Sequence, residues 1–334
     1  MSDGSGARPD PSPPPLGPRE AAVLAAQLRA NVERALRGKP QVVARAVETL
    51  IAGGHLLLED VPGVGKTTLA SALARSIAGT FRRIQFTSDL LPSDVLGAAM
   101  PEVVDGRASG SLVFQPGPLF AHVVLADEIN RASPKTQSAL LEAMSEARVT
   151  VDGRTHALPE PFFVVATQNP VEHHGTSPLP ESQLDRFHVR LSIGYPEPED
   201  EAAVLRDDPA QRELPRLPAV LRPEQVLALR ACTDGVKVDD ALLEYLLRIV
   251  GETRRHEAVQ VGASTRAALA LRRAAQARAV VDGRDFAIPE DVRELATDVL
   301  AHRLVLDARA PGEAATEEAR WIVDEILGRV PVPL

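Results

Sequence analysis

The stretch HLLLEDVPGVGKTTL, residues 55–69, decides the fold. Its three consecutive leucines, residues 56–58, are typical of a strand that is buried on both faces. The segment from Thr67 to Ala78 has the pattern of a helix that ends at Gly79. Between strand and helix lies a glycine-rich turn, whose backbone N–H groups can point into a nest for phosphate. The order of strand, turn and helix therefore predicts an α/β domain that binds a nucleotide.

The turn also carries the side chains that a nucleotide's phosphates need. In the general pattern, Gly, four residues and then Gly-Lys-Ser/Thr, the lysine meets the β- and γ-phosphates and the hydroxyl ligates Mg²⁺. Asp60 stands where the first glycine is usual, so the match is partial and depends on its context. We expect Thr67 to ligate Mg²⁺. The residues expected to bind the nucleotide here are Asp60, Val61, Pro62, Gly63, Val64, Gly65, Lys66, Thr67 and Thr68.

Length and composition restrict the class of protein. The chain has 334 residues, enough for about two domains. It shows no apolar run near the ~20 residues that span a membrane and no signal-peptide pattern, so we expect a soluble, cytoplasmic protein without membrane insertion. The single cysteine, Cys232, excludes disulfides and thiolate metal clusters and fits a core position. A net charge of −9 argues against broad binding of duplex DNA.

The patterning divides the chain into three parts. Residues 1–18 are rich in Pro, Gly and Ser and predict a disordered extension. Residues 19–196 begin with an amphipathic helix that ends near Gly38 and then alternate strands with helices, which predicts a parallel sheet covered on both faces. Helical patterns dominate residues 197–334 and predict a smaller helical domain. The strand candidates are residues 56–58, 83–86, 122–126, 162–166 and 188–193.

Polar residues follow two further strands of the predicted sheet. Asp127 and Glu128 follow the strand at residues 122–126, at the carboxyl edge where open α/β sheets bind ligands. Asp127 is expected to hold Mg²⁺, and Glu128 to polarise the water that attacks the γ-phosphate. Asn169 follows the strand at residues 162–166 and is a candidate to orient that water, although an Asn-Pro turn explains it without chemistry.

Two insertions interrupt the alternation of strands and helices. The segment from Val149 to His156 has short β-like runs about an Asp-Gly pair, which is a strong hairpin signal. Residues 96–114, with a second Asp-Gly pair at 105–106, also favour a hairpin. His173 and His174 are adjacent and lack metal-ligand spacing, so we expect solvated loop histidines and no metal beyond Mg²⁺.

Several blocks in order together resemble the MoxR family of AAA+ ATPases. The blocks are EDVPGVGKT at residues 59–67, RIQFT at 83–87, DLLPSD at 89–94, ADEINR at 126–131, TQNP at 167–170 and LPESQLDRF at 179–187. The resemblance extends over residues 20 to about 305. It implies an AAA+ P-loop domain with a parallel sheet of order 5-1-4-3-2, followed by a small all-helical lid. It also implies ATP bound between neighbours in a homo-oligomeric ring, which we expect to be a hexamer.

The resemblance gives roles to three further residues. Arg186 matches the family's arginine finger, which reaches the site of the neighbouring subunit. Arg266 matches the second sensor, in the first turn of a helix that Ser264 caps. Gly38 precedes a helix where such proteins contact adenine through backbone groups. Without the resemblance, Arg186 is a surface arginine and the segment around Arg266 is a capped helix start.

The sequence as a whole predicts Mg²⁺-dependent ATP hydrolysis that drives chaperone-like remodelling or activation of a protein client. A partner with a von Willebrand factor A domain is implied by the family. The first alternative is a motor of the same fold that acts on nucleic acid, which the acidic charge disfavours and which salt-sensitive stimulation by nucleic acid would support. The second is a nucleotide-dependent scaffold without hydrolysis, although Lys66, Thr67, Asp127 and Glu128 are all present.

Overall fold

The computed structural model describes residues 16–104, 107–169, 179–307 and 313–333. The predicted disordered extension therefore lies mostly outside the described residues, as do His173 and His174. Within the described ranges, no helix is long and apolar enough to cross a membrane.

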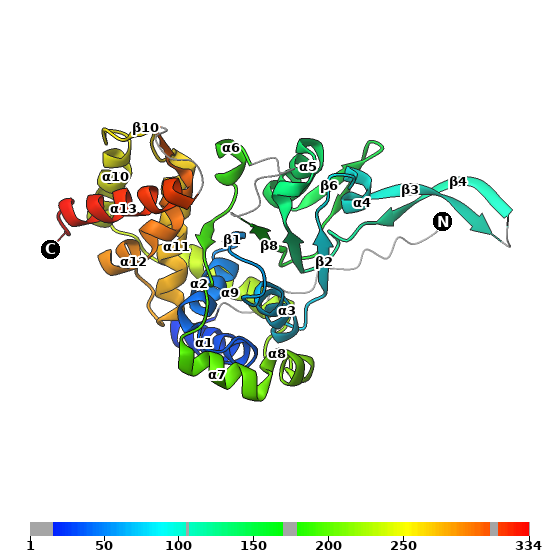
Figure 1. The fold of residues 1–334 in the computed structure, drawn as a ribbon, viewed down its shortest axis with the longest axis horizontal. Helices are drawn as coiled ribbons and strands as arrows, with labels where there is room; N and C mark the ends of the chain where they lie inside the picture. The colour runs from blue at the N-terminus through cyan, green and yellow to red at the C-terminus, as the bar shows by residue number, and fades with distance from the viewer. Residues whose placement is uncertain (1–15, 105–106, 170–178, 308–312, 334) are drawn as a thin grey trace, which may run out of the picture.

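A five-stranded parallel sheet forms the centre of the molecule (Figure 1). Numbered along the chain among themselves, its strands have the order 2-3-4-1-5, which confirms the expected order 5-1-4-3-2 read from the other edge. The central strands are almost wholly buried, as their continuous apolar runs predict. The strands of this sheet are β1 (Leu56–Glu59), β2 (Phe81–Gln85), β5 (Val123–Asp127), β8 (Phe163–Gln168) and β9 (Val189–Leu191).

Alternate residues of the strands pack into two separate cores, because side chains of a strand point to opposite faces in turn. Leu56 and Leu58 lie in one core with residues of α1, α2 and α3, whereas Leu57 lies in the other core with residues of α5. Pro18 and Pro40 start α1 and α2, where a proline costs no hydrogen bond. These helices are α1 (Pro18–Ala35), α2 (Pro40–Ile51), α3 (Lys66–Ser76) and α5 (Pro134–Glu146).

Both predicted hairpins are present. Strands β3 (Gly97–Val104) and β4 (Arg107–Pro116) pair antiparallel after the short helix α4 (Pro92–Leu96) and project from the body of the molecule (Figure 1). Strands β6 (Arg148–Val151) and β7 (Arg154–Ala157) form the second hairpin, and its turn residues Asp152 and Gly153 both have positive φ. The rings of Phe114 and His156 stack with centroids 3.9 Å apart, which joins the two hairpins.

Among the described residues, the C-terminal part of the chain from α7 to α13 is helical apart from the short strands β10 (Val259–Val261) and β11 (Val305–Leu306). Its helices pack on α1 and α2 as well as on one another. Two short elements of this part are η2 (Leu214–Arg216) and η3 (Ala301–Arg303). Two others precede it in the chain: η1 (Ile129–Arg131) follows β5, and α6 (Glu181–Leu184) lies between β8 and β9. The helices are α7 (Pro198–Asp207), α8 (Pro209–Arg212), α9 (Pro223–Gly235), α10 (Asp240–Thr253), α11 (Thr265–Val281), α12 (Pro289–Leu300) and α13 (Glu313–Arg329).

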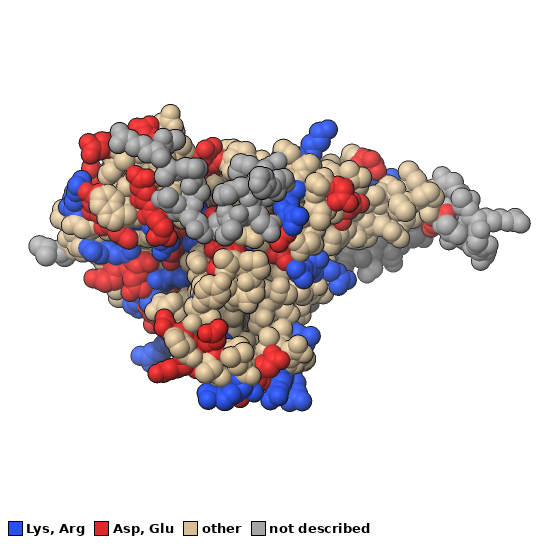
Figure 2. Space-filling view, in the orientation of Figure 1, with Lys and Arg blue, Asp and Glu red and all other residues tan. Residues whose placement is uncertain are grey.

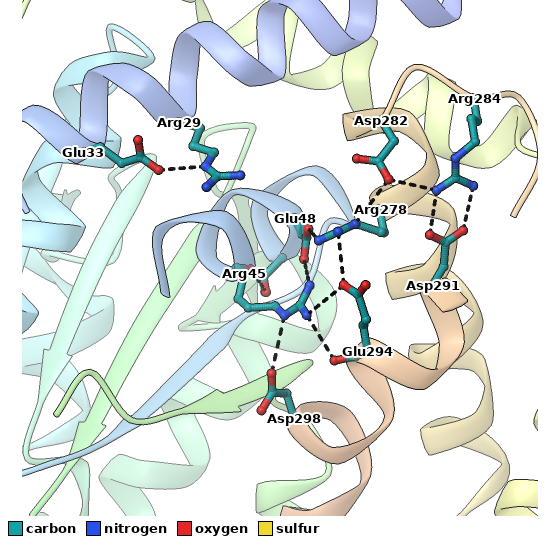
Figure 3. Close-up of polar contacts among 11 residues, drawn as sticks. Arg29, Glu33, Arg45, Glu48, Arg278, Asp282, Arg284, Asp291, Glu294 and Asp298 are labelled. Atoms are coloured by element: carbon teal, nitrogen blue, oxygen red, sulfur yellow. Dashed lines mark hydrogen bonds and ion pairs between the residues drawn. The ribbon is translucent and has the colours of Figure 1, made fainter. Parts of the chain in front are cut away.

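A buried ion-pair network joins α2 to the C-terminal helices (Figure 3). Glu48, with 3% of its side chain exposed, accepts from Arg45 at 2.8 Å and from Arg278 of α11 at 2.9 Å. Arg278 also reaches Glu294 of α12 at 3.1 Å, and Arg45 lies 3.5 Å from Asp298. Because each buried charge has opposite charges around it, the network stabilises one arrangement of α2, α11 and α12.

Candidate functional site

The phosphate loop lies between β1 and α3, as the sequence predicts. Gly63 and Gly65 have φ of 89° and 104°, in the left-handed region where glycine carries no steric penalty. A Cβ on Gly65 would lie 2.7 Å from Cδ1 of Leu36, so that side chain would have to shift, and the positive φ favours glycine there in any case. Lys66 is the first residue of α3, and its Nζ donates to the carbonyl oxygen of Asp60 at 2.8 Å. The Lys66 side chain thus folds back onto the phosphate loop.

The carboxylate of Asp60 points toward the segment that leaves β9. Its Oδ2 accepts from the N–H of Gly194 at 3.0 Å and from the hydroxyl of Ser192 at 3.2 Å, and it also accepts from the N–H of Ile193. Asp60 is 6% exposed. A glycine at this position could make none of these side-chain bonds, which gives a physical reason for the departure from the usual phosphate-loop pattern.

The acidic pair lies at the carboxyl end of β5, with its two carboxylates held by different donors. Oδ1 of Asp127 accepts from the hydroxyl of Thr167 at 2.6 Å, and its Oδ2 accepts from Nε of Arg83 at 3.1 Å. Glu128 has φ of 57°, and its Oε2 accepts from Nε2 of Gln85 at 2.7 Å.

Arg131 is also an ion-pair partner of Glu128, with its Nη1 3.1 Å from Oε2. No role was predicted from the sequence for the side chains of Arg83 and Gln85. The available signal was their alternation on β2, which places both on one side of a strand that neighbours β5.

A cavity of about 320 Å³ unites the loop and the acidic pair. Asn169, which is 6% exposed, also lines it, so the structure brings together most of the expected catalytic residues. The lining residues are Pro62, Gly63, Gly65, Lys66, Thr67, Thr68, Arg83, Asp127, Glu128 and Asn169.

A second cavity, of about 590 Å³, begins at the other end of the phosphate loop. Asp60 and Val61 line it together with Gln41 and Val42 of α2 and residues of β9, α12 and α13. Gly38 is absent from its lining; it has φ of 73° and a Cβ there would lie 2.6 Å from a carboxylate oxygen of Asp200. The segment expected to contact adenine therefore meets this cavity three residues after Gly38.

Arg186 and Arg266 come together in a third cavity, of about 370 Å³, away from the lining of the phosphate-loop cavity. Nη1 of Arg186 donates to the carbonyl oxygen of Leu141 at 2.8 Å and to the hydroxyl of Ser145 at 2.6 Å. Nη1 of Arg266 lies 3.7 Å from Oδ2 of Asp185, and the Arg266 side chain is 62% exposed. The prediction that Ser264 caps this helix is confirmed, since its hydroxyl accepts from the N–H of Ala267 at 3.1 Å.

Two buried histidines, His55 and His188, line this third cavity, which we call the arginine cavity. Burial lowers the pKa of His55 to about 4 and the pKa of His188 to about 3. Nδ1 of His55 accepts from the N–H of Val164 at 3.0 Å, so its Nε2 carries the proton and donates to the carbonyl oxygen of Met144. Both histidines are neutral at pH 7 and leave the positive charge of the cavity to its arginines.

Comparisons with known proteins agree with this geometry. Residues 55–189 match the family model of the ATPase family associated with various cellular activities (AAA), and residues 251–326 match the AAA lid domain. The chain is 48% identical to the uncharacterized protein YeaC of Bacillus subtilis (strain 168), covering 91% of this chain and 93% of YeaC. It is 42% identical to Chaperone MoxR1 of Mycobacterium tuberculosis (strain ATCC 25618 / H37Rv), covering 91% and 81% of the two chains.

A solved structure matches nearly the whole chain. The crystal structure of a protein from Cytophaga hutchinsonii ATCC 33406 superposes with a TM-score of 0.84 at 35% identity, covering 95% of this chain and 97% of the other. The likeness in fold thus covers both the sheet and the C-terminal helices.

Proposed function

This chain belongs to the MoxR family of AAA+ ATPases, and from that premise we propose that it hydrolyses ATP, with Mg²⁺, in the 320 Å³ cavity beside the phosphate loop. The observation that carries this proposal is the meeting of Lys66, Asp127 and Glu128 around one cavity, although they come from distant parts of the sequence. Hydrolysis needs a phosphate nest, a metal ligand and a group to activate water, and this cavity offers all of them.

The donors in the cavity fit Mg²⁺, which prefers hydroxyl and carboxylate oxygens. Thr67 and Asp127 both line the cavity and supply such oxygens. Bound Mg²⁺ would supply neutralisation of the phosphate charge. Arg83 donates to one oxygen of Asp127, and the carboxylate keeps lone pairs for a metal ion. Lys66 has further N–H donors for phosphate besides the one that binds the Asp60 carbonyl.

Glu128 is the proposed general base for the attacking water. Gln85 and Arg131 both bind one oxygen of its carboxylate, Oε2, and we assign acceptance of the proton from water to the other oxygen. Asn169 lines the same cavity and is proposed to orient the water through its amide.

We assign the base and ribose of ATP to the 590 Å³ cavity. The phosphate loop is continuous between the two cavities: Asp60 and Val61 line the larger one, and Pro62 and Gly63 line the smaller one. A nucleotide lying along the loop would therefore have its phosphates at Lys66 and its base near Val42. This placement makes C-terminal helices α12 and α13 part of the nucleoside site.

Arg186 and Arg266 are proposed to complete the site of a neighbouring subunit. They share a cavity that is separate from the phosphate loop of their own chain, and Arg266 is largely exposed. Arginine that stabilises the charge on the transferred phosphoryl group can come from a neighbour, as in other phosphate-loop enzymes. The arrangement supports a homo-oligomeric ring, which we propose to be a hexamer.

The energy of hydrolysis is proposed to drive chaperone-like remodelling or activation of a protein client in the cytoplasm. Support comes from the name of the relative Chaperone MoxR1 and from the hairpins that project from the ATPase core (Figure 1). On the face shown in Figure 2, acidic and basic side chains of the described residues are interspersed, unlike a broad nucleic-acid-binding surface. A von Willebrand factor A domain protein is the partner class that we propose.

Substitution of Glu128 by glutamine tests the proposed activity. Glu128→Gln removes the base but leaves the loop and Asp127, so ATP affinity should stay within about threefold while turnover falls by roughly 10²–10⁴-fold. ATP binding is measured by titration calorimetry and turnover by phosphate release. Unchanged turnover in Glu128→Gln would contradict the role of Glu128, and absence of any ATPase activity in the natural chain would contradict the proposed function.

A further inference from the structure

Arg303 ties the C-terminal helical part to the turn that carries Arg186. The Arg303 side chain is 3% exposed, and its Nε donates to Oδ1 of Asp185 at 2.8 Å. Its Nη2 donates to the carbonyl oxygen of Phe187 at 2.5 Å, and its Nη1 donates to that of His188 at 3.2 Å. One buried guanidinium therefore binds the chain on both sides of Arg186.

Asp185 receives donors from two segments of the C-terminal part. Its Oδ1 is held by Arg303 of η3, while its Oδ2 lies 3.4 Å from the hydroxyl of Ser264 and 3.7 Å from Nη1 of Arg266. His302 adds a contact from Nε2 to the carbonyl oxygen of Phe187 at 3.2 Å. The turn at residues 185–188 is thus bonded to both η3 and the start of α11.

The contacts of Arg303 require the shape of a guanidinium. Arginine presents five N–H donors in a planar fork, whereas lysine has one ammonium group that cannot span a carboxylate and two carbonyl oxygens in the same way. Burial lowers the pKa of Arg303 to about 10, so the side chain still carries its charge at pH 7 opposite Asp185. Substitution of Arg303 by lysine should therefore free the turn without removing the positive charge.

The Arg186 turn lies between this attachment and a second one. On the other side, Arg186 itself is bonded to Leu141 and Ser145 of α5, which belongs to the ATPase core. A shift of η3 relative to α5 must move the backbone of the turn, because the Arg303 bonds leave it little freedom. The orientation of Arg186 therefore depends on where the C-terminal helices of the same chain lie.

Resting on the proposed role of Arg186 in the neighbouring site, we propose that Arg303 is a positioning residue for that arginine. Arg303 fixes the turn at residues 185–188 to η3, so that the C-terminal part of one subunit sets the arginine that the next subunit receives. Because α12, which precedes η3, also borders the nucleoside cavity of its own chain, this attachment connects that cavity to the turn that carries Arg186.

Mixed assemblies separate this role from general damage. Acceptor subunits carry Arg186→Ala and retain a working phosphate loop, whereas donor subunits carry Lys66→Ala and retain Arg186. Mixing the two should restore part of the ATPase activity. Adding Arg303→Lys to the donor should lower this restored activity by about tenfold or more, because small misplacement of a catalytic group is costly. The same change in the acceptor should leave the restored activity within about twofold, because its Arg186 is already gone.

Arg284→Lys in the donor is the matched control. Arg284 is also a partly buried arginine that forks onto a carboxylate, at 2.7 and 2.8 Å from the Asp291 oxygens, but its hydrogen-bond partners among the described residues all lie in the C-terminal part. It should leave the restored activity unchanged. Asp185→Asn in the donor provides a second variant if Arg303→Lys does not fold, and it should also lower the restored activity.

The outcomes distinguish the inference from the function on which it rests. No restored activity in the parental mixture, with mixed assemblies confirmed by native mass spectrometry, would overturn the interfacial role of Arg186 and with it the role of Arg303. Restored activity that is equal with Arg303→Lys and Arg284→Lys donors would overturn the role of Arg303 alone. An equal loss whether Arg303→Lys is in the donor or the acceptor would likewise overturn it, since that pattern indicates damage to the fold.

Discussion

The phosphate-loop cavity and the arginine cavity differ in how the chain builds them. The first is centred on a continuous strand, loop and helix, where Gly65 and Lys66 are neighbours in sequence and in space. The second is assembled from distant segments, so that Arg186 and Arg266 meet only through packing of the C-terminal part. The predicted phosphate nest is thus built by neighbouring residues, whereas the arginine cavity depends on tertiary contacts. We therefore expect substitutions in the two cavities to impair different steps.

The largest contrast is expected between Lys66→Ala and Arg186→Ala. Lys66→Ala should lose ATP binding, because the lysine belongs to the cavity that holds the phosphates. Arg186→Ala should retain ATP binding and lose about 10³-fold in turnover, as expected for an arginine that acts on the transferred phosphoryl group. Binding of a fluorescent ATP analogue and steady-state phosphate release measure the two quantities. Loss of binding in Arg186→Ala would remove the distinction between the cavities.

The next largest effect is expected in the buried network between α2 and the C-terminal helices (Figure 3). Glu48→Ala removes the most buried acceptor that Arg45 and Arg278 share and should lower the free energy of unfolding by about 3 kcal/mol, the lower end of the range for a broken buried pair, because Glu294 still binds both arginines. Glu252→Ala is the control, because the pair of Glu252 with Arg255 is exposed and should contribute at most about 1 kcal/mol. Urea denaturation measures both. Equal losses of stability in the two variants would show that burial does not increase the contribution of the network.

Acid should lower the free energy of unfolding through the two buried histidines that line the arginine cavity. The folded pKa of His55 is about 4 and that of His188 about 3, both below the ordinary value of 6.5, so the unfolded chain binds more protons. The contribution of each histidine to the free energy of unfolding is then present above about pH 6.5 and falls as the pH drops toward these folded values. Between pH 7 and pH 5, each histidine should lower the free energy of unfolding by about 2 kcal/mol.

Thermal unfolding of His188→Gln and of the natural chain at both pH values tests this. The variant should lose less stability on acidification than the natural chain does. The same pH dependence in both chains would exclude His188 as a source of the acid sensitivity.

The smallest effect concerns the helix start beside the arginine cavity. Ser264→Ala removes the hydroxyl that accepts from the N–H of Ala267 and should lower the free energy of unfolding by about 1 kcal/mol. Asp239→Ala at the start of α10 is a matched cap substitution far from Asp185, since Asp239 accepts from the N–H of Leu242 at 2.7 Å. We expect similar losses of stability from both. If Ser264→Ala alone lowered the free energy of unfolding by more than about 3 kcal/mol, a loss as large as that expected in the buried network, Ser264 would do more than cap the helix.

The sheet and its phosphate loop were predictable because their signals are local. Leu56, Leu57 and Leu58 indicate a strand buried on both faces, and the Asp152-Gly153 pair indicates a hairpin turn; both are found. The resemblance to a family added the strand order, which no local pattern contains. Asp60 was assigned to the nucleotide from its place in the loop, but the bonds of its carboxylate go to residues 192–194, a contact across 132 residues or more that spacing cannot reveal.

The arginine cavity shows the other limit of sequence reasoning. Arg186 and Arg266 were identified by resemblance, but their shared cavity and its separation from the phosphate loop follow from packing. Arg303 was not identified, because a buried arginine after a helix has no sequence signal that distinguishes it from a surface one. Only its bonds to three residues of the 185–188 turn reveal that it has a role there.

We propose that the phosphate loop of one subunit and Arg186 of the next make a single catalytic site. A structure of the Glu128→Gln assembly with ATP and Mg²⁺ tests this directly. We expect Arg186 of one subunit to lie within about 3.2 Å of the γ-phosphate bound at Lys66 of its neighbour. A γ-phosphate contacted only by residues of its own chain, with Arg186 still bonded to Leu141 and Ser145, would contradict it.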